Sequence, residues 1–172
     1  MNTNIVIQPI ENHQLDALST FAAAEFTRVF GHLYERQHLD DHLVEKYSAA
    51  FFTAELARGC KILVALDDGK LIGYIKYGPM GLPIEHEPDS MEIHRLYVHP
   101  DQQGAGIGRK LAEKALSDMS DDIDIYLGVW SENHQAQVFY QRFGFEKVGD
   151  YDYIVGPHRD HEFIFRRGKE TA

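Results

Sequence analysis

Short segments in which apolar and polar residues alternate predict β-strands, and seven such segments are spread along the chain. They cover residues 4–10, 62–66, 71–77, 92–98, 123–130, 145–155 and 162–166. Asp67, Asp68 and Gly69 separate the second segment from the third, a composition typical of a hairpin turn. Gly156 and Pro157 predict another turn between the last two segments.

Between these segments, apolar residues recur at helical spacing and predict about four helices. The helical regions are residues 13–58, with a break around Gly31 and His32, then residues 106–116 and 136–143. Residues 79–90 are rich in proline and glycine without periodicity, which indicates a long loop. The pattern therefore predicts one mixed α/β domain over residues 1–172, with about seven strands and about four helices.

Composition excludes some classes of partner. The chain has 27 Asp and Glu against 17 Lys and Arg, a net charge of -10, which argues against nucleic-acid binding and favours cationic partners such as amines. No apolar stretch reaches the roughly 18 residues needed to cross a bilayer, so we expect no membrane partner. Residues 1–9 lack the pattern of a signal peptide, and Cys60 is the only cysteine. We expect a soluble, cytoplasmic protein in which Cys60 is a buried or semi-buried structural thiol.

The most informative segment contains glycines at three alternate positions, 104, 106 and 108, directly before a predicted helix. Such a turn lets successive backbone N–H groups point into one concavity at the positive end of the helix dipole, as a pyrophosphate requires. Arg109 and Lys110 add positive charge on an otherwise acidic chain. The spacing fits neither a P-loop nor the dinucleotide-binding fingerprint, so a nucleotide-binding protein of those classes is a remote alternative, and a plain flexible turn is another.

Two sequence blocks stand out along the chain. The first, after the strand Leu96-Tyr97-Val98, is Gln103-Gly104-Ala105-Gly106-Ile107-Gly108, and the second is Asn133-x-x-Ala136-x-x-Phe139-Tyr140-x-x-x-Gly144-Phe145. Together these blocks resemble the GNAT superfamily of acetyl-CoA-dependent N-acetyltransferases. Residues 26–31, 127–133 and 149–153 resemble the PaiA-like branch, described as spermine/spermidine acetyltransferases. The resemblance covers nearly the whole chain. It implies a mostly antiparallel central sheet, acetyl-CoA as co-substrate, and direct transfer to a primary amine in a ternary complex, with a polyamine as the first expectation.

The resemblance also implies which residues contact the co-substrate. The strand residues Leu96, Tyr97 and Val98 would contact its thioester carbonyl and pantetheine arm. The pyrophosphate would lie on the turn formed by Gln103, Gly104, Ala105, Gly106, Ile107, Gly108 and Arg109. Asn133 corresponds to a cofactor-contacting asparagine, although a helix cap is an alternative role for it. Tyr140 corresponds to the family's general acid at the sulfur, with a core tyrosine as the alternative.

Acetyl transfer needs a neutral amine, and an alkylamine of pKa about 10.4 is protonated at pH 7. A base is therefore useful. Glu92 and His94 are the candidates, because residues two apart on a strand point to the same face. We prefer Glu92, although both residues could merely pair with neighbouring side chains.

Other features of the chain leave the acceptor open. Among the ten histidines the tightest pair is His158 and His161, which has no cysteine nearby, so we expect no metal. Residues 25–45 mix aromatic and acidic side chains, as a wall for a cationic amine or as an ordinary amphipathic helix pair.

The alternatives to a polyamine acetyltransferase are an acetyltransferase for a protein N-terminus, lysine or amino sugar, and an inactive acyl-CoA-binding module. A homodimer is compatible with the chain, but no feature specifies one.

Overall fold

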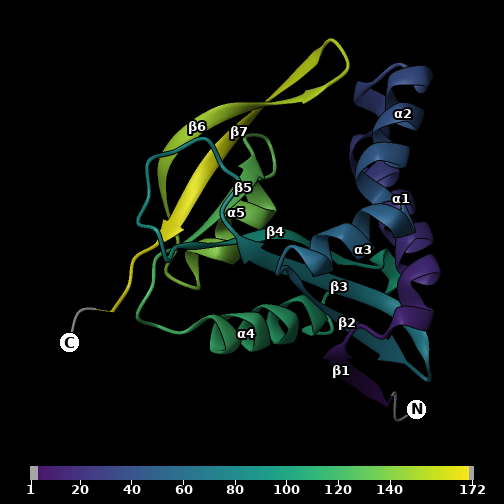
Figure 1. The fold of residues 1–172 in the computed structure, drawn as a ribbon, viewed down its shortest axis with the longest axis horizontal. Helices are drawn as coiled ribbons and strands as arrows, with labels where there is room; N and C mark the ends of the chain where they lie inside the picture. Colours follow the sequence, from purple (N-terminus) through teal and green to yellow (C-terminus); the bar gives the residue numbers. More distant parts are fainter. Residues whose placement is uncertain (1–3, 171–172) are drawn as a thin grey trace.

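The computed structural model describes residues 4–170 and contains one seven-stranded sheet, in the order β1-β2-β3-β4-β5-β7-β6 (Figure 1). The strands are β1 (Ile5–Pro9), β2 (Lys61–Asp67), β3 (Lys70–Pro79), β4 (Met91–Val98), β5 (Ile125–Trp130), β6 (Glu146–Val155) and β7 (His158–Arg167). Every neighbouring pair is antiparallel except β4 and β5. The predicted mixed α/β class, the strand number and the mostly antiparallel sheet are confirmed.

The helices are α1 (Leu15–Phe30), α2 (Arg36–Tyr47), α3 (Ala49–Ala57), α4 (Ile107–Met119) and α5 (His134–Gln141). The region 13–58, predicted as two helices, thus contains three. The additional break lies at Ser48, whose backbone is extended and whose side chain accepts a hydrogen bond from the N–H of Phe51 at 3.2 Å. Ser48 therefore caps a new helix instead of continuing α2. None of the helices in residues 4–170 combines the length and apolar character that crossing a bilayer requires.

Two hydrophobic cores hold helices against opposite faces of the sheet. On one face, α4 buries Leu111 in a core that includes Ile93 of β4. On the other, Leu18 of α1 and Phe52 of α3 share a core with Tyr74 of β3. The sheet is therefore the middle of three layers, and its central strands are covered on both sides. Cys60 is buried, as predicted.

The sheet opens between its two central parallel strands. β4 pairs with β5 only from Met91 opposite Ile125 to Ile93 opposite Leu127. Beyond that point β4 continues to Val98 and β5 to Trp130, and the two strands make no further pairs. One edge of residues 94–98 thus has no strand beside it, which leaves backbone groups available to another extended chain.

A bulge in β4 changes which side chains share a face. Lys76 of β3 lies opposite Arg95, whereas the next residue, Tyr77, lies opposite Ile93. His94 is therefore an additional residue that interrupts the ladder. Ile93 and Leu96 both join the core on the α4 face, so His94 and Arg95 are accommodated between them without joining it.

Candidate active site

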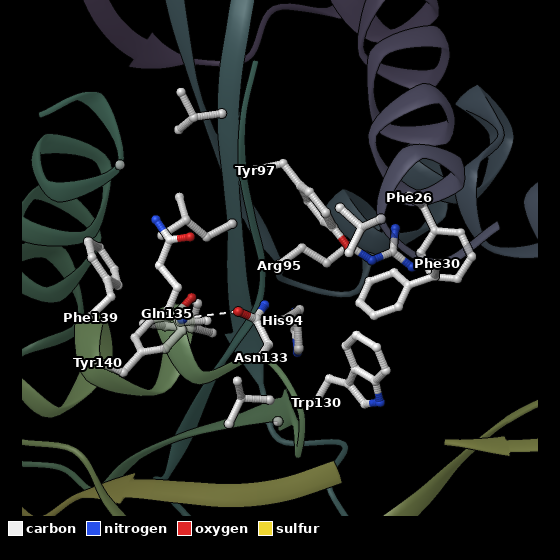
Figure 2. A pocket seen from close by; sticks show the side chains of 18 of the residues that line it. Phe26, Phe30, His94, Arg95, Tyr97, Trp130, Asn133, Gln135, Phe139 and Tyr140 are labelled. Atoms are coloured by element: carbon white, nitrogen blue, oxygen red, sulfur yellow. Dashed lines mark hydrogen bonds between the residues drawn. The ribbon is translucent and has the colours of Figure 1, made fainter. Parts of the chain in front are cut away.

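A cavity of about 750 Å³ lies where β4 and β5 separate. The glycine-rich turn and α4 contribute to its lining, as do α5 and the ends of α1 and of β7. Figure 2 shows Phe139 and Tyr140 on one side of the central strand, and Phe26, Phe30 and Trp130 on the other. The cavity therefore passes through the split in the sheet and connects two differently lined halves.

The residues predicted to bind the co-substrate gather at this cavity, with one difference. Those that line it are Leu96, Tyr97, Val98, Gln103, Gly104, Gly106, Ile107, Gly108, Arg109, Asn133 and Tyr140. Ala105 is exposed and is not part of the lining. It sits between two glycines with left-handed backbones, at φ +83° and +78°, which turn the chain so that this side chain faces solvent.

The turn leaves the first amides of α4 available. Gly106 is the N-cap and supplies no side-chain cap, and the first intrahelical bond runs from the N–H of Lys110 to the carbonyl of Gly106 at 3.0 Å. The N–H groups of Ile107, Gly108 and Arg109 precede that bond, at the positive end of a 13-residue helix. Arg109 lies beside them and pairs with Glu113 at 2.7 Å. This end of the cavity suits an anion.

The two predicted α5 residues have distinct roles. Asn133 caps the helix, because its Oδ1 accepts a hydrogen bond from the N–H of Ala136 at 3.1 Å, and it also borders the cavity. The Tyr140 ring packs edge-on against Phe139 and Phe145. Burial raises the pKa of Tyr140, so its hydroxyl stays protonated at neutral pH and can act as a donor.

Glu92 has the properties of a base that works near neutral pH. It is only 8% exposed, and its Oε2 accepts a hydrogen bond from the N–H of Gly81 at 2.8 Å. Burial raises the pKa of Glu92 to about 7, although this N–H, that of Leu82 and the charge of Lys76 lower it. The carboxylate is therefore able both to hold and to release a proton at pH 7.

His94 lies beside Glu92 as predicted, with its Nε2 at 3.7 Å from Oε2 of Glu92. Its ring nitrogens are both engaged, Nε2 with the carbonyl of Pro79 at 2.9 Å and Nδ1 with Nζ of Lys76 at 3.1 Å. Burial, followed by the charge of Lys76, lowers the pKa of His94 to about 4. Of the two candidates, only Glu92 has the protonation behaviour of a base at neutral pH.

Next to His94 lies a compact group of three polar side chains, Glu55, Cys60 and Lys76. Nζ of Lys76 is 2.5 Å from Oε2 of Glu55, and Sγ of Cys60 is 3.6 Å from the same oxygen. Within residues 4–170, Glu55, Cys60 and His94 are the one set of donor atoms gathered closely enough to resemble a metal site. The ammonium of Lys76 already contacts two of the three, so it supplies the positive charge at that place.

Sequence reasoning missed the acidic residues that the C-terminal strands bring to the cavity. Oε2 of Glu162 accepts a hydrogen bond from the Tyr151 hydroxyl at 2.7 Å, and burial raises the pKa of Glu162 to about 7. Asp160 is buried and accepts hydrogen bonds from the Tyr34 hydroxyl and from Nε2 of His158. The alternation of β7 puts residues 160 and 162 on one face. That this face borders the cavity follows from the strand order, which a sequence period does not give.

Arg95 was missed because the bulge directs it to the cavity. Its Nη1 donates to the carbonyl of Lys46 at 2.8 Å, and its guanidinium lies 3.9 Å from the centre of the Tyr47 ring. These contacts fix one wall of the cavity through cation–π and hydrogen-bond interactions. A strictly alternating strand would have placed residue 95 on the opposite face.

For residues 25–45 the sequence left open an acceptor wall or an ordinary amphipathic helix pair, and the structure has features of both. The aromatic residues Phe26, Phe30 and Tyr34 line the cavity. The carboxylates of this region do not: Glu25 pairs with Arg28 at 2.7 Å, and Glu35, Asp40 and Asp41 are exposed. The carboxylates that line the cavity are instead those of Glu92, Asp160 and Glu162, and the basic side chains that line it are those of Arg28, Lys46, Lys76, Arg95, Arg109 and Arg142.

Comparison with known proteins agrees with this geometry. Residues 20–145 match the acetyltransferase (GNAT) family. An uncharacterized N-acetyltransferase of Mycobacterium bovis is 27% identical over 155 residues, which cover 88% of this chain and 96% of the relative. A probable spermine N(1)-acetyltransferase of Bacillus subtilis subsp. natto is 29% identical over 93 residues, which cover 50% of this chain and 59% of the relative. The crystal structure of PaiA N-acetyltransferase from Thermoplasma acidophilum in complex with coenzyme A has the same fold, with a TM-score of 0.76, 23% identity and coverage of 96% and 99%. The chain belongs to the GNAT acetyltransferase family, and it is an N-acetyltransferase.

Proposed function

We propose that this protein transfers the acetyl group of acetyl-CoA directly to a primary amine, with Glu92 as the base and a polyamine as the acceptor. The observation that carries the proposal is the position of Glu92. This buried carboxylate has a pKa of about 7 and borders the same cavity as the glycine-rich turn. A proton acceptor and an anion-binding helix end thus lie at a single opening in the sheet.

The co-substrate half of the cavity supports this proposal through groups of this chain. The amides of Ile107, Gly108 and Arg109 would bind the pyrophosphate at the N-terminus of α4. The unpaired edge of residues 94–98 would hold the pantetheine arm as an added strand. The Tyr140 hydroxyl would donate a proton or a hydrogen bond to the departing thiolate. Acetyl-CoA supplies the activated acyl group.

The acceptor amine must lose a proton before it attacks the thioester. The pKa of an alkylammonium group, about 10.4, lies about 3.4 units above pH 7, so the free energy cost of deprotonating it at that pH is about 4–5 kcal/mol. The Glu92 carboxylate takes this proton directly or through one water, because its ionised form is already populated at that pH. No covalent acyl-enzyme is needed, since the neutral amine itself is the nucleophile.

A polyamine acceptor is supported by the carboxylates and aromatic rings that line the other half of the cavity. Asp160 and Glu162 line it together with Glu92, and Phe26 and Trp130 add aromatic faces that attract cations. The similarity to a probable spermine N(1)-acetyltransferase agrees with this chemistry. Acidic and aromatic groups together favour an acceptor that carries more than one ammonium group.

The test combines ligand binding with turnover. Acetyl-CoA at about 100 times its dissociation constant should stabilise the fold by roughly 2.7 kcal/mol. Release of CoA is then followed with spermidine, spermine, a monoamine and a peptide with a free N-terminus. We expect saturation with the polyamines and an acid limb of the rate near pH 7. Turnover with the peptide alone would assign a protein acceptor, and stabilisation without any turnover would assign an acyl-CoA-binding module.

Glu92→Gln is the variant for the assigned base. It should lower kcat by about 10²–10⁴-fold, because the amide cannot accept the proton. Acetyl-CoA binding should be retained, since Glu92 lies outside the glycine-rich turn. Asp40→Asn is a matched control that also replaces one carboxylate by an amide, at an exposed position away from the cavity.

A further inference from the structure

Lys76 of β3 is buried in a way that the proposed reaction does not explain. It is 3% exposed, and its ammonium contacts Oε2 of Glu55 at 2.5 Å and Nδ1 of His94 at 3.1 Å. Arg58 already pairs with the other oxygen of Glu55 at 2.7 Å. Glu55 therefore has a cationic partner without Lys76, and the contact of Lys76 with His94 is the more informative one.

The hydrogen bonds of His94 define its tautomer. A lysine ammonium carries only donors, so Nδ1 of His94 must accept from Nζ of Lys76. The ring proton is then on Nε2, which donates to the carbonyl of Pro79 at 2.9 Å. Protonation of Nδ1 would place two cations 3.1 Å apart in a buried site. Lys76 thus opposes the imidazolium form and selects the neutral Nε2–H form.

This tautomer determines the charge next to Glu92, because Nε2 of His94 is 3.7 Å from Oε2 of Glu92. An imidazolium at that distance would stabilise the ionised carboxylate and weaken it as a proton acceptor. With the neutral ring in place, the positive charge stays on Lys76, on the far side of the imidazole from Glu92. The ion pair with Glu55 further reduces its effect.

We propose that Lys76 is a positioning residue for the acetyl transfer: its hydrogen bond to Nδ1 holds His94 as a neutral imidazole, so that no cation lies directly against the carboxylate that takes the proton from the acceptor. This inference rests on the proposed role of Glu92. It assigns to the Glu55–Lys76–His94 group a function in proton transfer and not only in packing.

The charged and titratable groups around these side chains are consistent with it. His94 is faced by Lys76 from β3, by Glu55 from α3, by Cys60 before β2, and by Arg95 on its own strand. Both cations oppose its protonation, and burial has the same direction.

Glu92 is faced by the amides of Gly81 and Leu82, by the charge of Lys76, and by Glu162 of β7. Tyr151 of β6 also lies within its electrostatic influence. Glu162 raises the pKa of Glu92, whereas the two amides and Lys76 lower it. Of these groups only Lys76 is a cation, and it contacts His94 and not the Glu92 carboxylate.

The first test uses the wild-type protein, so no variant needs to fold. Nitrogen-15 NMR of the histidine side chains reports which ring nitrogen carries the proton. We expect His94 to stay in the Nε2–H form across the neutral pH range without titrating. A signal of Nδ1–H, or titration at the pH of an ordinary histidine, would overturn the proposal. This readout does not depend on enzymatic activity.

The second test removes the ammonium. In Lys76→Met, Glu55 faces His94 without a cation between them, so the imidazole ring should become protonated. The imidazolium then places a positive charge beside the Glu92 carboxylate. The acid limb of the rate should then move to lower pH by about one unit. In Lys76→Met with His94→Gln the limb should return to its wild-type position or higher, because no ionisable ring remains.

Two other outcomes would overturn the positioning role. A lower kcat with an unmoved acid limb would show that Lys76 is only structural. Histidine spectra as expected, but without an acid limb near pH 7 in the wild type, would reject Glu92 as the base, and the positioning role with it. The limb is measured with two amines of different pKa, since a limb that belongs to the enzyme does not follow the amine.

Discussion

The hydroxyl of Tyr151 donates a 2.7 Å hydrogen bond to Oε2 of Glu162, and the two side chains meet directly over the backbone of Gly128. Their strands are neighbours, with Tyr151 of β6 opposite Glu162 of β7. A Cβ atom at position 128 would lie 2.6 Å from the Tyr151 hydroxyl and 2.9 Å from Oε2 of Glu162. Because residue 128 of β5 is a glycine, Tyr151 and Glu162 have room to meet at this place beside the cavity.

Gly128→Ala should separate this pair and lower kcat/KM for a polyamine. The methyl group would overlap both oxygens, and a hydrogen bond to a carboxylate contributes about 1.5–3 kcal/mol. We therefore expect a loss of about tenfold or more, measured as steady-state CoA release. Gly168→Ala is the control, because the nearest atom to its Cβ, Oδ1 of Asp124, is 4.0 Å away. Wild-type kcat/KM in Gly128→Ala would contradict this role.

The stability of the fold should depend on pH through Glu92. Its pKa is raised from 4.5 to about 7 in the folded protein, so folding favours the protonated form. The associated stability is present below pH 4.5 and is lost as the pH rises through 7. Glu92→Gln should therefore be stabilised relative to wild type at pH 8, by at most about 3 kcal/mol, and not at about pH 4.5. Thermal unfolding of both proteins at the two pH values measures the difference, and a difference independent of pH would argue against the raised pKa.

Alanine at Gly104 or Gly106 should cost stability without any steric clash. Both residues have left-handed φ angles, and a Cβ atom added at either would lie more than 4 Å from every atom of residues 4–170 outside its own stretch of backbone. The cost is thus conformational, about 1–2 kcal/mol each, and acetyl-CoA binding should weaken as the turn relaxes. Gly108→Ala keeps an ordinary backbone and meets Val98 at 3.6 Å, so its unfolding free energy should change little. Denaturant titrations compare the three variants, and equal costs at all three positions would contradict the conformational explanation.

Tyr140→Phe should lower kcat and leave acetyl-CoA affinity within about twofold, because only the hydroxyl is lost. The ring contacts with Phe139 and Phe145 remain. Tyr77→Phe is a matched control: it also removes a hydroxyl, which donates to Asp118 at 2.7 Å, and Tyr77 does not line the cavity. Unchanged turnover in Tyr140→Phe would make Tyr140 a core residue only.

Sequence patterns determined much of the architecture, because they report local backbone preference. Alternation identified the seven strands, and turn residues identified the hairpins after Asp67 and Val155. The glycine-rich turn followed from spacing alone, since left-handed backbone favours glycine at Gly104 and Gly106. The same alternation correctly placed Glu92 and His94 side by side.

Only the tertiary structure decided how these elements combine into a site. The bulge at His94 turned Arg95 toward the cavity, and the order β5-β7-β6 brought Tyr151 and Glu162 there from distant segments. Strand pairing joins residues far apart in sequence, and a local period carries no record of the partner. Protonation behaviour is decided in the same way. Alternation puts Glu92 and His94 on one face of the strand, and the ammonium of Lys76 lowers the pKa of both. Burial disfavours the charged form of each group, so it raises the pKa of Glu92 and lowers that of His94.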